Sequence, residues 1–233
     1  MNAVITGASK GIGKAIAEKL ALEGFNVAIC ARHAGTLATA RADIQQKNPS
    51  ATVLAEVVDM GEKSEVMAFA GKIMSAFPQV DVLVNNAGIF VPGAIHQEEE
   101  GLLEKLMAVN VYSAYHLTRA LLPMMTARRK GHIFNMCSTA SHKSYPNGGS
   151  YSITKHALLG FSKNLREELQ AHNITVTSIS PGPTLTPSWE GFEAPPGRMM
   201  PPEDIASVVW SAWSLAPQTV IEEILLRPML GDF

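Results

Sequence analysis

Short apolar runs alternate with longer amphipathic segments along most of the chain. The runs are rich in Val and Ile, as strands buried on both faces of a sheet should be. Regular alternation of strand and helix predicts a parallel sheet with helices on both faces, and right-handed crossovers favour the doubly wound, three-layer α/β arrangement with seven strands. The runs occupy 3–6, 27–31, 52–57, 80–84, 132–137, 175–180 and 222–226, and the helical segments lie near 11–23, 35–47, 62–76, 99–127, 152–171 and 203–215.

Length and composition favour one folded unit over residues 1–233. The chain is 46% hydrophobic with a net charge of −2, and no linker or basic block interrupts it. We therefore expect no nucleic acid and no anionic membrane as a partner, since both need clustered Lys and Arg. The start does not resemble a signal peptide, no stretch approaches the ~18 apolar residues of a membrane span, and two cysteines form no disulfide framework. A cytoplasmic location is the resulting expectation.

One irregular segment follows the sixth predicted strand. Seven prolines lie between Pro181 and Pro202, together with Trp189 and Phe192, so neither a helix nor a central strand fits there. Ligands of doubly wound sheets bind beyond the carboxyl ends of the strands. We expect a substrate-covering loop at about 183–201; the alternative is a plain surface connection.

A glycine-rich turn joins the first strand to the first helix. Gly7, Gly11 and Gly13 follow a G-x-x-x-G-x-G spacing, which differs from the usual G-x-G-x-x-G. Glycines let the backbone approach a pyrophosphate closely, and the helix N-terminus offers free N–H groups. A Rossmann-type dinucleotide site is therefore expected at Gly7, Ser9, Lys10, Gly11, Ile12 and Gly13.

The second predicted strand ends at Arg32 without an acidic residue. An acid there would bind the ribose 2′-hydroxyl of NAD, whereas Arg32 suits a 2′-phosphate, and Lys10 can join it. Each cation alone could be an ordinary surface charge. Together they favour NADP(H) over NAD(H).

Tyr151 and Lys155 stand four residues apart, so one helix face carries both. An ammonium group near a phenol lowers the phenol pKa, and a tyrosine tuned in this way can exchange a proton with a carbonyl oxygen. Ser138, at the end of the fifth strand, can hydrogen-bond the same oxygen, although it could equally cap a turn.

With these motifs, the chain resembles the short-chain dehydrogenase/reductase family, and in particular its NADP-preferring, 3-oxoacyl-ACP reductase-like members. Residues 6–13 match the cofactor turn of the family, 85–88 its Asn-Asn-Ala-Gly motif, and 181–186 the segment beside the nicotinamide. The catalytic tetrad is matched by Asn110, Ser138, Tyr151 and Lys155. The resemblance adds as cofactor contacts Asp59, Met60, Asn86, Ala87, Gly88, Asn110, Tyr151, Lys155, Pro181, Gly182, Thr184 and Thr186.

The resemblance also implies roles. Tyr151 would be the general acid in reduction, and Lys155 would lower the pKa of Tyr151 and hold the nicotinamide ribose. Ser138 would polarise the carbonyl, and Asn110 would hold a water that returns protons. Thr184 stands where the family usually has Val or Ile, so Thr186 is favoured for the carboxamide contact.

Three functions follow as alternatives. The first is NADPH-dependent reduction of a ketone or aldehyde, such as a 3-oxoacyl thioester, a small ketone or a pterin-like ketone. The second is NADP-dependent alcohol oxidation, and the third a non-catalytic NADP-binding redox sensor. The resemblance implies a homotetramer or homodimer through helices 99–127 and 152–171. The seven histidines show no metal-ligand spacing, and residues 98–100 favour the N-terminus of the helix that follows them.

Overall fold

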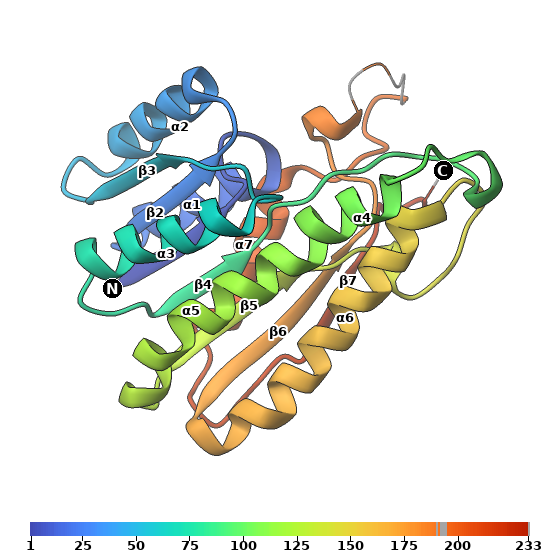
Figure 1. Ribbon diagram of the computed structural model, residues 1–233. Helices are drawn as coiled ribbons and strands as arrows, with labels where there is room; N and C mark the ends of the chain where they lie inside the picture. Colours follow the sequence, from blue (N-terminus) through green and yellow to red (C-terminus); the bar gives the residue numbers. More distant parts are fainter. Residues whose placement is uncertain (190, 192–194, 233) are drawn as a thin grey trace.

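A parallel sheet forms the centre of the molecule (Figure 1). The structure is a computed structural model that describes residues 1–189, 191 and 195–232. Within this part of the chain, seven strands pair in the order β3-β2-β1-β4-β5-β6-β7. This order confirms the predicted doubly wound Rossmann fold. The strands are β1 Asn2–Thr6, β2 Asn26–Ala31, β3 Val53–Val57, β4 Val82–Asn85, β5 Gly131–Met136, β6 Ile174–Pro181 and β7 Glu223–Leu226.

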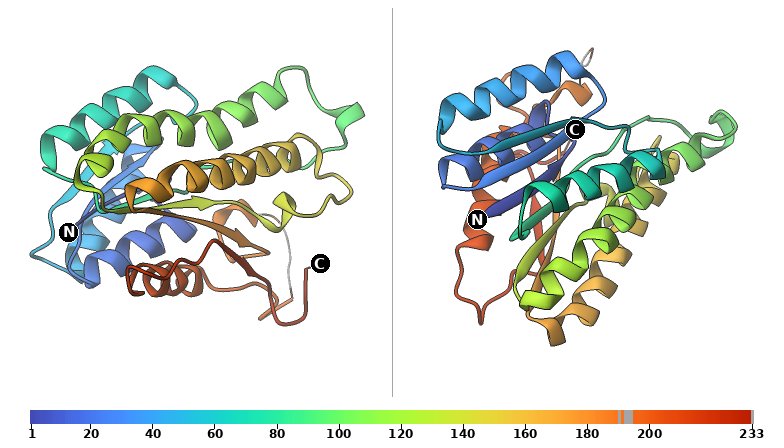
Figure 2. Two further views of the ribbon diagram at one scale, coloured as in Figure 1. Left: turned by 90° about the horizontal axis from the view of Figure 1, so that it is seen from below. Right: turned by 60° about the vertical axis from the view of Figure 1, so that its left-hand side comes forward.

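Helices cover both faces of the sheet (Figure 2). The helices α1, α2 and α7 pack on one face, and α3, α5 and α6 on the other. None of the described helices is long and apolar enough to cross a membrane. The helices are α1 Gly11–Leu22, α2 Ala34–Lys47, α3 Lys63–Ala76, α4 Leu102–Met107, α5 Ser113–Arg128, α6 Gly149–Leu169 and α7 Pro202–Trp213, with 3₁₀ turns at Ile95–Gln97, Thr139–Ser141, Gln170–His172 and Pro187–Trp189.

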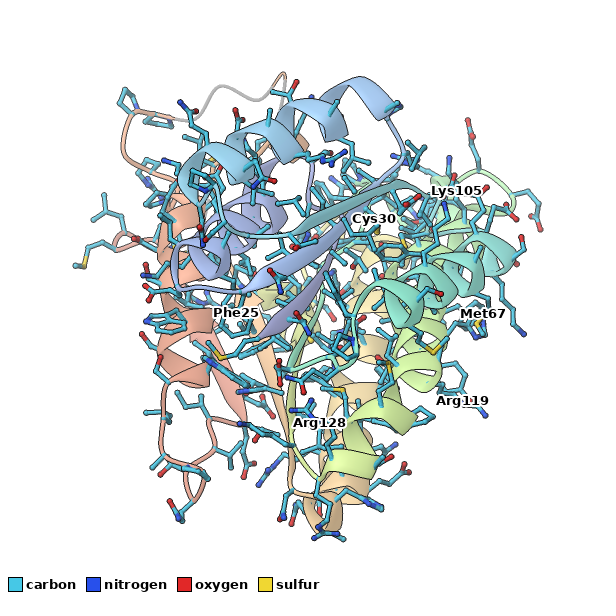
Figure 3. The ribbon with its side chains drawn as sticks, turned by 90° about the vertical axis from the view of Figure 1, so that its left-hand side faces the viewer. Phe25, Cys30, Met67, Lys105, Arg119 and Arg128 are labelled. Carbon is cyan, nitrogen blue, oxygen red and sulfur yellow. The ribbon has the colours of Figure 1, made fainter. Side chains whose placement is uncertain are left out.

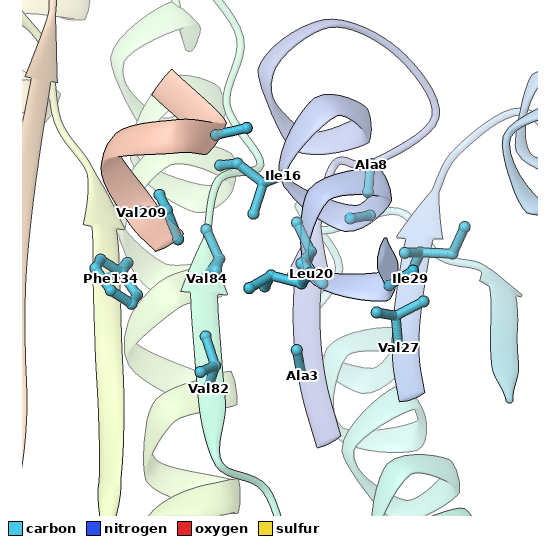
Figure 4. Packing of buried hydrophobic residues seen from close by; sticks show 14 of the residues in the cluster. Ala3, Ala8, Ile16, Leu20, Val27, Ile29, Val82, Val84, Phe134 and Val209 are labelled. Atoms are coloured by element: carbon cyan, nitrogen blue, oxygen red, sulfur yellow. The ribbon is translucent and has the colours of Figure 1, made fainter. Parts of the chain in front are cut away.

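Two apolar clusters, one on each face, hold the layers together. In the first, Leu20 of α1 and Val209 of α7 pack over the strands (Figure 4). In the second, Phe69 of α3 and Leu117 of α5 pack on the opposite face. Burying each such side chain contributes roughly 1.5–3 kcal/mol. Cys30 lies inside the second cluster (Figure 3), and its burial raises the pKa of the thiol to about 12.

The helix predicted near 99–127 is observed with a later start and an irregular turn inside it. Gly101 has a φ of 84°, which starts α4 only at Leu102. A π-helical turn at Ala108–Tyr112 then separates α4 from α5. A π turn contains one extra residue within the helical ladder, and hydrophobic periodicity does not register it. Similarly, α6 begins at Gly149, three residues before its predicted start, and β5 ends at Met136, one residue before its predicted end.

Candidate active site

A cavity of about 660 Å³ opens at the carboxyl ends of β1, β4, β5 and β6. The elements that reach it are the turn before α1, the segments after β4, β5, β6 and β7, and the start of α6. Among the residues that line it are the predicted Gly7, Lys10, Gly11, Ile12, Gly13, Asn86, Ala87, Gly88, Ser138, Tyr151, Lys155, Pro181, Gly182, Thr184 and Thr186.

The glycine turn is built so that only glycine fits. Gly7 and Gly11 have φ values of 64° and 55°, in the left-handed region that disfavours side chains. A Cβ on Gly13 would overlap the Nδ2 atom of Asn86 and the carbonyl oxygen of Gly7. The turn therefore presents bare backbone and the N-terminus of α1 to the cavity, as a dinucleotide pyrophosphate requires.

Thr6 connects this turn to the segment after β4. Its hydroxyl oxygen accepts hydrogen bonds from the backbone N–H groups of Asn86, at 3.0 Å, and Ala87, at 2.9 Å. The Asn86 side chain donates in return to the carbonyl oxygens of Thr6 and Gly7, at 2.9 and 3.1 Å. The predicted Asn86 and Ala87 contacts are thus fixed relative to the glycine turn before any ligand binds.

Asn110 lies on the π-helical turn and is 1% exposed. Its Oδ1 accepts from the N–H of Ile89 at 2.8 Å, and its Nδ2 donates to the carbonyl of Ile89 at 3.1 Å and to the Thr154 hydroxyl at 3.0 Å. Asn110 does not line the cavity among the described residues, but its Oδ1 lies 3.3 Å from a Cβ placed on Gly88, which does. It therefore joins the segment after β4 to α6.

Lys155 is a buried cation on α6. Its ammonium donates to the carbonyl of Met136, at the end of β5, at 2.8 Å. It also lies 5.7 Å from the centroid of the Tyr151 ring. Burial lowers the pKa of Lys155 to about 8, because the charged form loses hydration.

Tyr151 is half-buried one turn before Lys155. Burial raises the pKa of its phenol above the ordinary value, and a hydrogen bond with the Ser138 hydroxyl, which favours the phenolate, opposes part of that rise. Ser138 is itself held by a reciprocal cap: its Oγ accepts from the N–H of Ala140 at 3.1 Å, and its own N–H donates to Ser141 at 3.2 Å. The three predicted polar groups are therefore brought together at one side of the cavity.

Aromatic side chains lie on the phenol side of the cavity. Phe90 packs edge-on against Tyr151 with ring centroids 4.8 Å apart, and Trp189 lies 6.4 Å from Phe90. Phe90 and Trp189 also line the cavity. An apolar or aromatic portion of a substrate would find its partners here.

Besides Asn110, four predicted cofactor contacts do not line the cavity in the described part of the chain: Ser9, Arg32, Asp59 and Met60. Arg32 is exposed beyond the end of β2. The Asp59 carboxylate accepts from the N–H of Gly61 at 2.9 Å, while the Met60 side chain is buried in the second cluster. Their roles stay predictions.

Arg227 and Asp232 also line the cavity but were not identified from the sequence. The two side chains form an ion pair of 2.8 Å, and the Oδ1 of Asp232 lies 2.7 Å from a Cβ placed on Gly182. Thr154, which holds Asn110, was also missed, and Thr6 was identified as part of the cofactor turn but not as the residue that holds Asn86. Each stands beside a recognised motif residue, and that proximity is the one sequence signal that could have singled them out.

The segment 183–201 leaves the sheet beyond the carboxyl end of β6 (Figure 1, orange). Thr184 and Met200 form a parallel bridge, with backbone hydrogen bonds of 2.8 and 3.0 Å between residues 183–185 and 200. Thr186 packs against the glycine turn, 3.0 Å from a Cβ placed on Gly11. The predicted Phe192 lies outside the described residues. Both ends of the segment are therefore attached beside the cavity.

The arrangement suits proton transfer at a bound oxygen. The phenol of Tyr151, the hydroxyl of Ser138 and the ammonium group of Lys155 lie together in the cavity that the glycine turn also lines. The exposed backbone of that turn fits a dinucleotide. No cluster of three His, Cys, Asp or Glu side chains within 1–189, 191 and 195–232 is arranged to hold a metal ion.

Comparison with known proteins gives consistent matches over most of the chain. The family model described as short chain dehydrogenase matches residues 1–196. An oxidoreductase of Staphylococcus saprophyticus is 34% identical over 227 residues, which cover 97% of each chain. Sepiapterin reductase of Chlorobaculum tepidum is 32% identical over 238 residues, covering 98% of this chain and 96% of the relative.

A solved structure agrees with these matches. A metagenomic short-chain oxidoreductase in complex with NADP aligns with a TM-score of 0.85 and 33% identity, over 98% of this chain and 97% of that one.

Proposed function

The chain belongs to the short chain dehydrogenase family, an oxidoreductase family acting on alcohol and carbonyl groups, and we propose that it reduces a ketone or aldehyde with NADPH. The observation that carries the proposal is the group of Ser138, Tyr151 and Lys155 at one side of the cavity. The glycine turn lies in the same cavity, so hydride transfer and proton transfer can occur at one bound carbonyl.

The residues of the glycine turn suit a bound dinucleotide. Gly7, Gly11 and Gly13 would hold the pyrophosphate, because a Cβ at these positions would be strained or would overlap a neighbour. Asn86 and Lys155 would contact the nucleoside on the nicotinamide side. When bound, the reduced nicotinamide supplies the hydride, and the protein supplies orientation and electrostatics.

Tyr151 acts as the general acid. Its phenol donates a proton to the carbonyl oxygen, and the Ser138 hydroxyl donates a hydrogen bond to the same oxygen as negative charge develops. Lys155 stabilises the resulting phenolate electrostatically, since its ammonium lies 5.7 Å from the centre of the ring. Asn110, linked to Ile89 and Thr154, fixes the helix that carries both groups.

Replacing the phenol tests this role. In Tyr151→Phe we expect kcat to fall by at least about 100-fold, because general acid catalysis contributes that much or more. NADPH affinity, measured by the fluorescence of the reduced nicotinamide, should change little. A variant that retains near-normal kcat would exclude Tyr151 as the acid.

We further propose a preference for NADPH over NADH. Arg32 is exposed beyond the end of β2, and Lys10 lines the cavity, so both can swing toward a 2′-phosphate. Arg32→Ala should weaken NADPH binding by about tenfold, the worth of one charge-assisted hydrogen bond, and leave NADH binding nearly unchanged. Equal losses in the two Kd values would contradict the proposal.

The substrate side of the cavity supports a carbonyl compound with an apolar portion, because Phe90 and Trp189 line it. The described ends of segment 183–201 lie against the cavity, which supports its role as a substrate-covering loop. A panel of a 3-oxoacyl thioester, diacetyl and a pterin ketone, with NADPH consumption followed by absorbance, would identify the class.

Assembly is proposed to use α5 and α6. Tyr112 and Tyr115 of the π turn and α5 are 51% and 39% exposed, and Ile153 of α6 is 44% exposed. Arg119 also points outward from α5 (Figure 3), and its guanidinium donates to the Tyr115 hydroxyl at 3.1 Å. Light scattering on the wild-type chain and on Tyr115→Glu distinguishes a dimer or tetramer from a monomer.

A further inference from the structure

Glu98 reaches the N-terminus of the helix that carries Tyr151. Its Oε1 accepts a hydrogen bond from the backbone N–H of Ser150 at 2.8 Å, and its Oε2 accepts one from the Ser150 hydroxyl. The two residues are 52 positions apart in the chain. Ser150 is the second residue of α6 and directly precedes Tyr151.

The helix has no side-chain cap of its own. Its N-cap residue is Gly148, which lacks a side chain, and no side-chain cap hydrogen bond is made there. The first N–H groups of a helix need acceptors from outside the helix, and a carboxylate suits the partial positive charge at that end. Glu98 therefore supplies from a distant segment what a local Ser or Asp supplies at most helices.

The surrounding backbone is shaped around this carboxylate. Gly149 has a φ of 38°, and a Cβ there would overlap the Glu98 carboxylate and the carbonyl oxygen of Gly93. The N–H of Gly93 donates to the carbonyl of Asn147 at 3.0 Å, and Asn147 has a φ of 60°. The positive φ of Asn147 and Gly149 and the hydrogen bond from Gly93 to Asn147 therefore leave room for the Glu98 carboxylate beside the first turn of α6.

The same segment carries the aromatic neighbour of the phenol. Phe90 and Glu98 both lie between β4 and α4, and Phe90 packs edge-on against Tyr151. Glu98 attaches the far end of this segment to the residue before Tyr151, while Asn110 attaches its near end at Ile89. The segment between β4 and α4 is therefore linked to α6 at two places, and Tyr151 lies between them in the helix.

We propose that Glu98 is a positioning residue for Tyr151: its carboxylate anchors the first turn of α6 and so sets where the phenol meets the substrate carbonyl. This proposal rests on the proposed role of Tyr151 as the general acid. A displacement of a reacting group by about 1 Å can cost about 100-fold in rate, so an anchor one residue away affects turnover directly.

The charge state of Glu98 agrees with this role. Its hydrogen bonds from Ser150 lower the pKa of the carboxyl group below the ordinary value. The group therefore stays ionised throughout the neutral range, where both of its oxygens accept.

The test compares Glu98→Ala, Glu98→Gln, Ser150→Ala and the double variant Glu98→Ala/Ser150→Ala in the full chain. Each is assayed with NADPH and the panel compound that the wild type reduces fastest. We expect Glu98→Ala to lower kcat by about tenfold, with a smaller change in KM and an unchanged Kd for NADPH. Glu98→Gln keeps an acceptor oxygen and should recover most of the activity. The kcat of the double variant should be no lower than that of Glu98→Ala, because both substitutions remove the same contact between Glu98 and Ser150.

A second readout needs no substrate. The phenolate absorbance of Tyr151, obtained as the difference between each protein and its Tyr151→Phe counterpart, reports the pKa of this phenol. Glu98→Ala should lower that pKa, because the helix end loses a negative charge and the phenol gains access to water. Glu99→Ala is the matched control: Glu99 is an exposed neighbour with the same side chain, and kcat and the phenol pKa should stay at wild-type values.

The outcomes separate the two proposals. Full activity in Tyr151→Phe would overturn the proposed function itself. Loss of activity in Tyr151→Phe, together with wild-type kcat and an unmoved phenol pKa in Glu98→Ala, would overturn the positioning role alone and leave Glu98 as a stabilising contact. If Glu98→Ala fails to fold, Ser150→Ala decides, because it removes the hydroxyl that donates to Glu98 and should lower both kcat and the phenol pKa. Wild-type kcat and an unmoved phenol pKa in Ser150→Ala would then overturn the proposal.

Discussion

The two ends of the cavity are built by different means. At the glycine turn, Gly7, Gly11 and Gly13 shape the site through backbone conformation, and Asn86 and Thr186 pack so closely that no side chain fits there. At the phenol end, Lys155 and Tyr151 depend on contacts from β5 and from the segment after β4. The first end is shaped by bare backbone with no room for a side chain, whereas the second is an assembly of functional side chains from several segments.

This difference predicts how substitutions at each end of the cavity affect binding, turnover and stability. A backbone turn with no room for a side chain loses its shape when one residue no longer fits, so steric changes there should be severe and should affect dinucleotide binding most. An assembled site has several supports, so the loss of one support should be graded and should affect turnover or stability. The variants below test that contrast.

The largest effect is expected for Gly13→Val. A side chain there would overlap Asn86 and the Gly7 carbonyl, so the turn must open. We expect NADPH affinity to fall by about 100-fold or more and the unfolding free energy by about 2 kcal/mol. Fluorescence titration and thermal unfolding measure both. Gly71→Ala is the control, because nothing lies within 4 Å of a Cβ in that helix, and it should bind NADPH normally.

An intermediate effect is expected for Thr6→Val, at the junction of the two ends. The change keeps the shape but leaves the N–H groups of Asn86 and Ala87 without their acceptor. We expect the unfolding free energy to fall by about 2 kcal/mol, with little change in Thr6→Ser, which keeps the hydroxyl. Urea unfolding measures the difference. Equal stability of the two variants would mean that these amides find other acceptors.

The smallest effect is expected in the pH dependence of stability. Lys155 has a folded pKa of about 8 against an ordinary 10.5. Between these values the unfolded chain binds more protons at Lys155, so the contribution of this residue to stability rises with pH. Relative to Lys155→Met, we expect a gain of about 1 kcal/mol per pH unit over this range by urea unfolding. A flat difference would show that the ammonium is solvated in the folded chain.

The same contrast explains what could be predicted from the sequence. The strands follow from apolar periodicity, their doubly wound arrangement from right-handed crossovers, and the glycine turn from the spacing of Gly7, Gly11 and Gly13. The packing of that turn against Asn86 and Thr186 could not be read from the spacing. Arg32 was placed correctly at the end of β2, but its direction depends on what binds there.

The long-range supports could not be predicted from the residues themselves. Glu98 was expected to favour the N-terminus of the helix that follows it, yet its carboxylate binds Ser150 of α6. Asn110 was identified only by resemblance, because a polar residue in a helix carries no signal of a partner at Ile89 or Thr154. A sequence pattern reports the face on which a side chain lies, but not the segment that packs against it.

The π-helical turn at Ala108–Tyr112 has a consequence for redesign of the chain. Deleting one residue there would restore a regular α-helix and would improve any score based on helix propensity. The deletion would also rotate one end of the helix relative to the other by about 100°, the angle of one residue. Asn110 would then turn away from Ile89. Selection for a more ideal backbone would therefore work against the site, and this irregular turn should be held constant in any stabilised version.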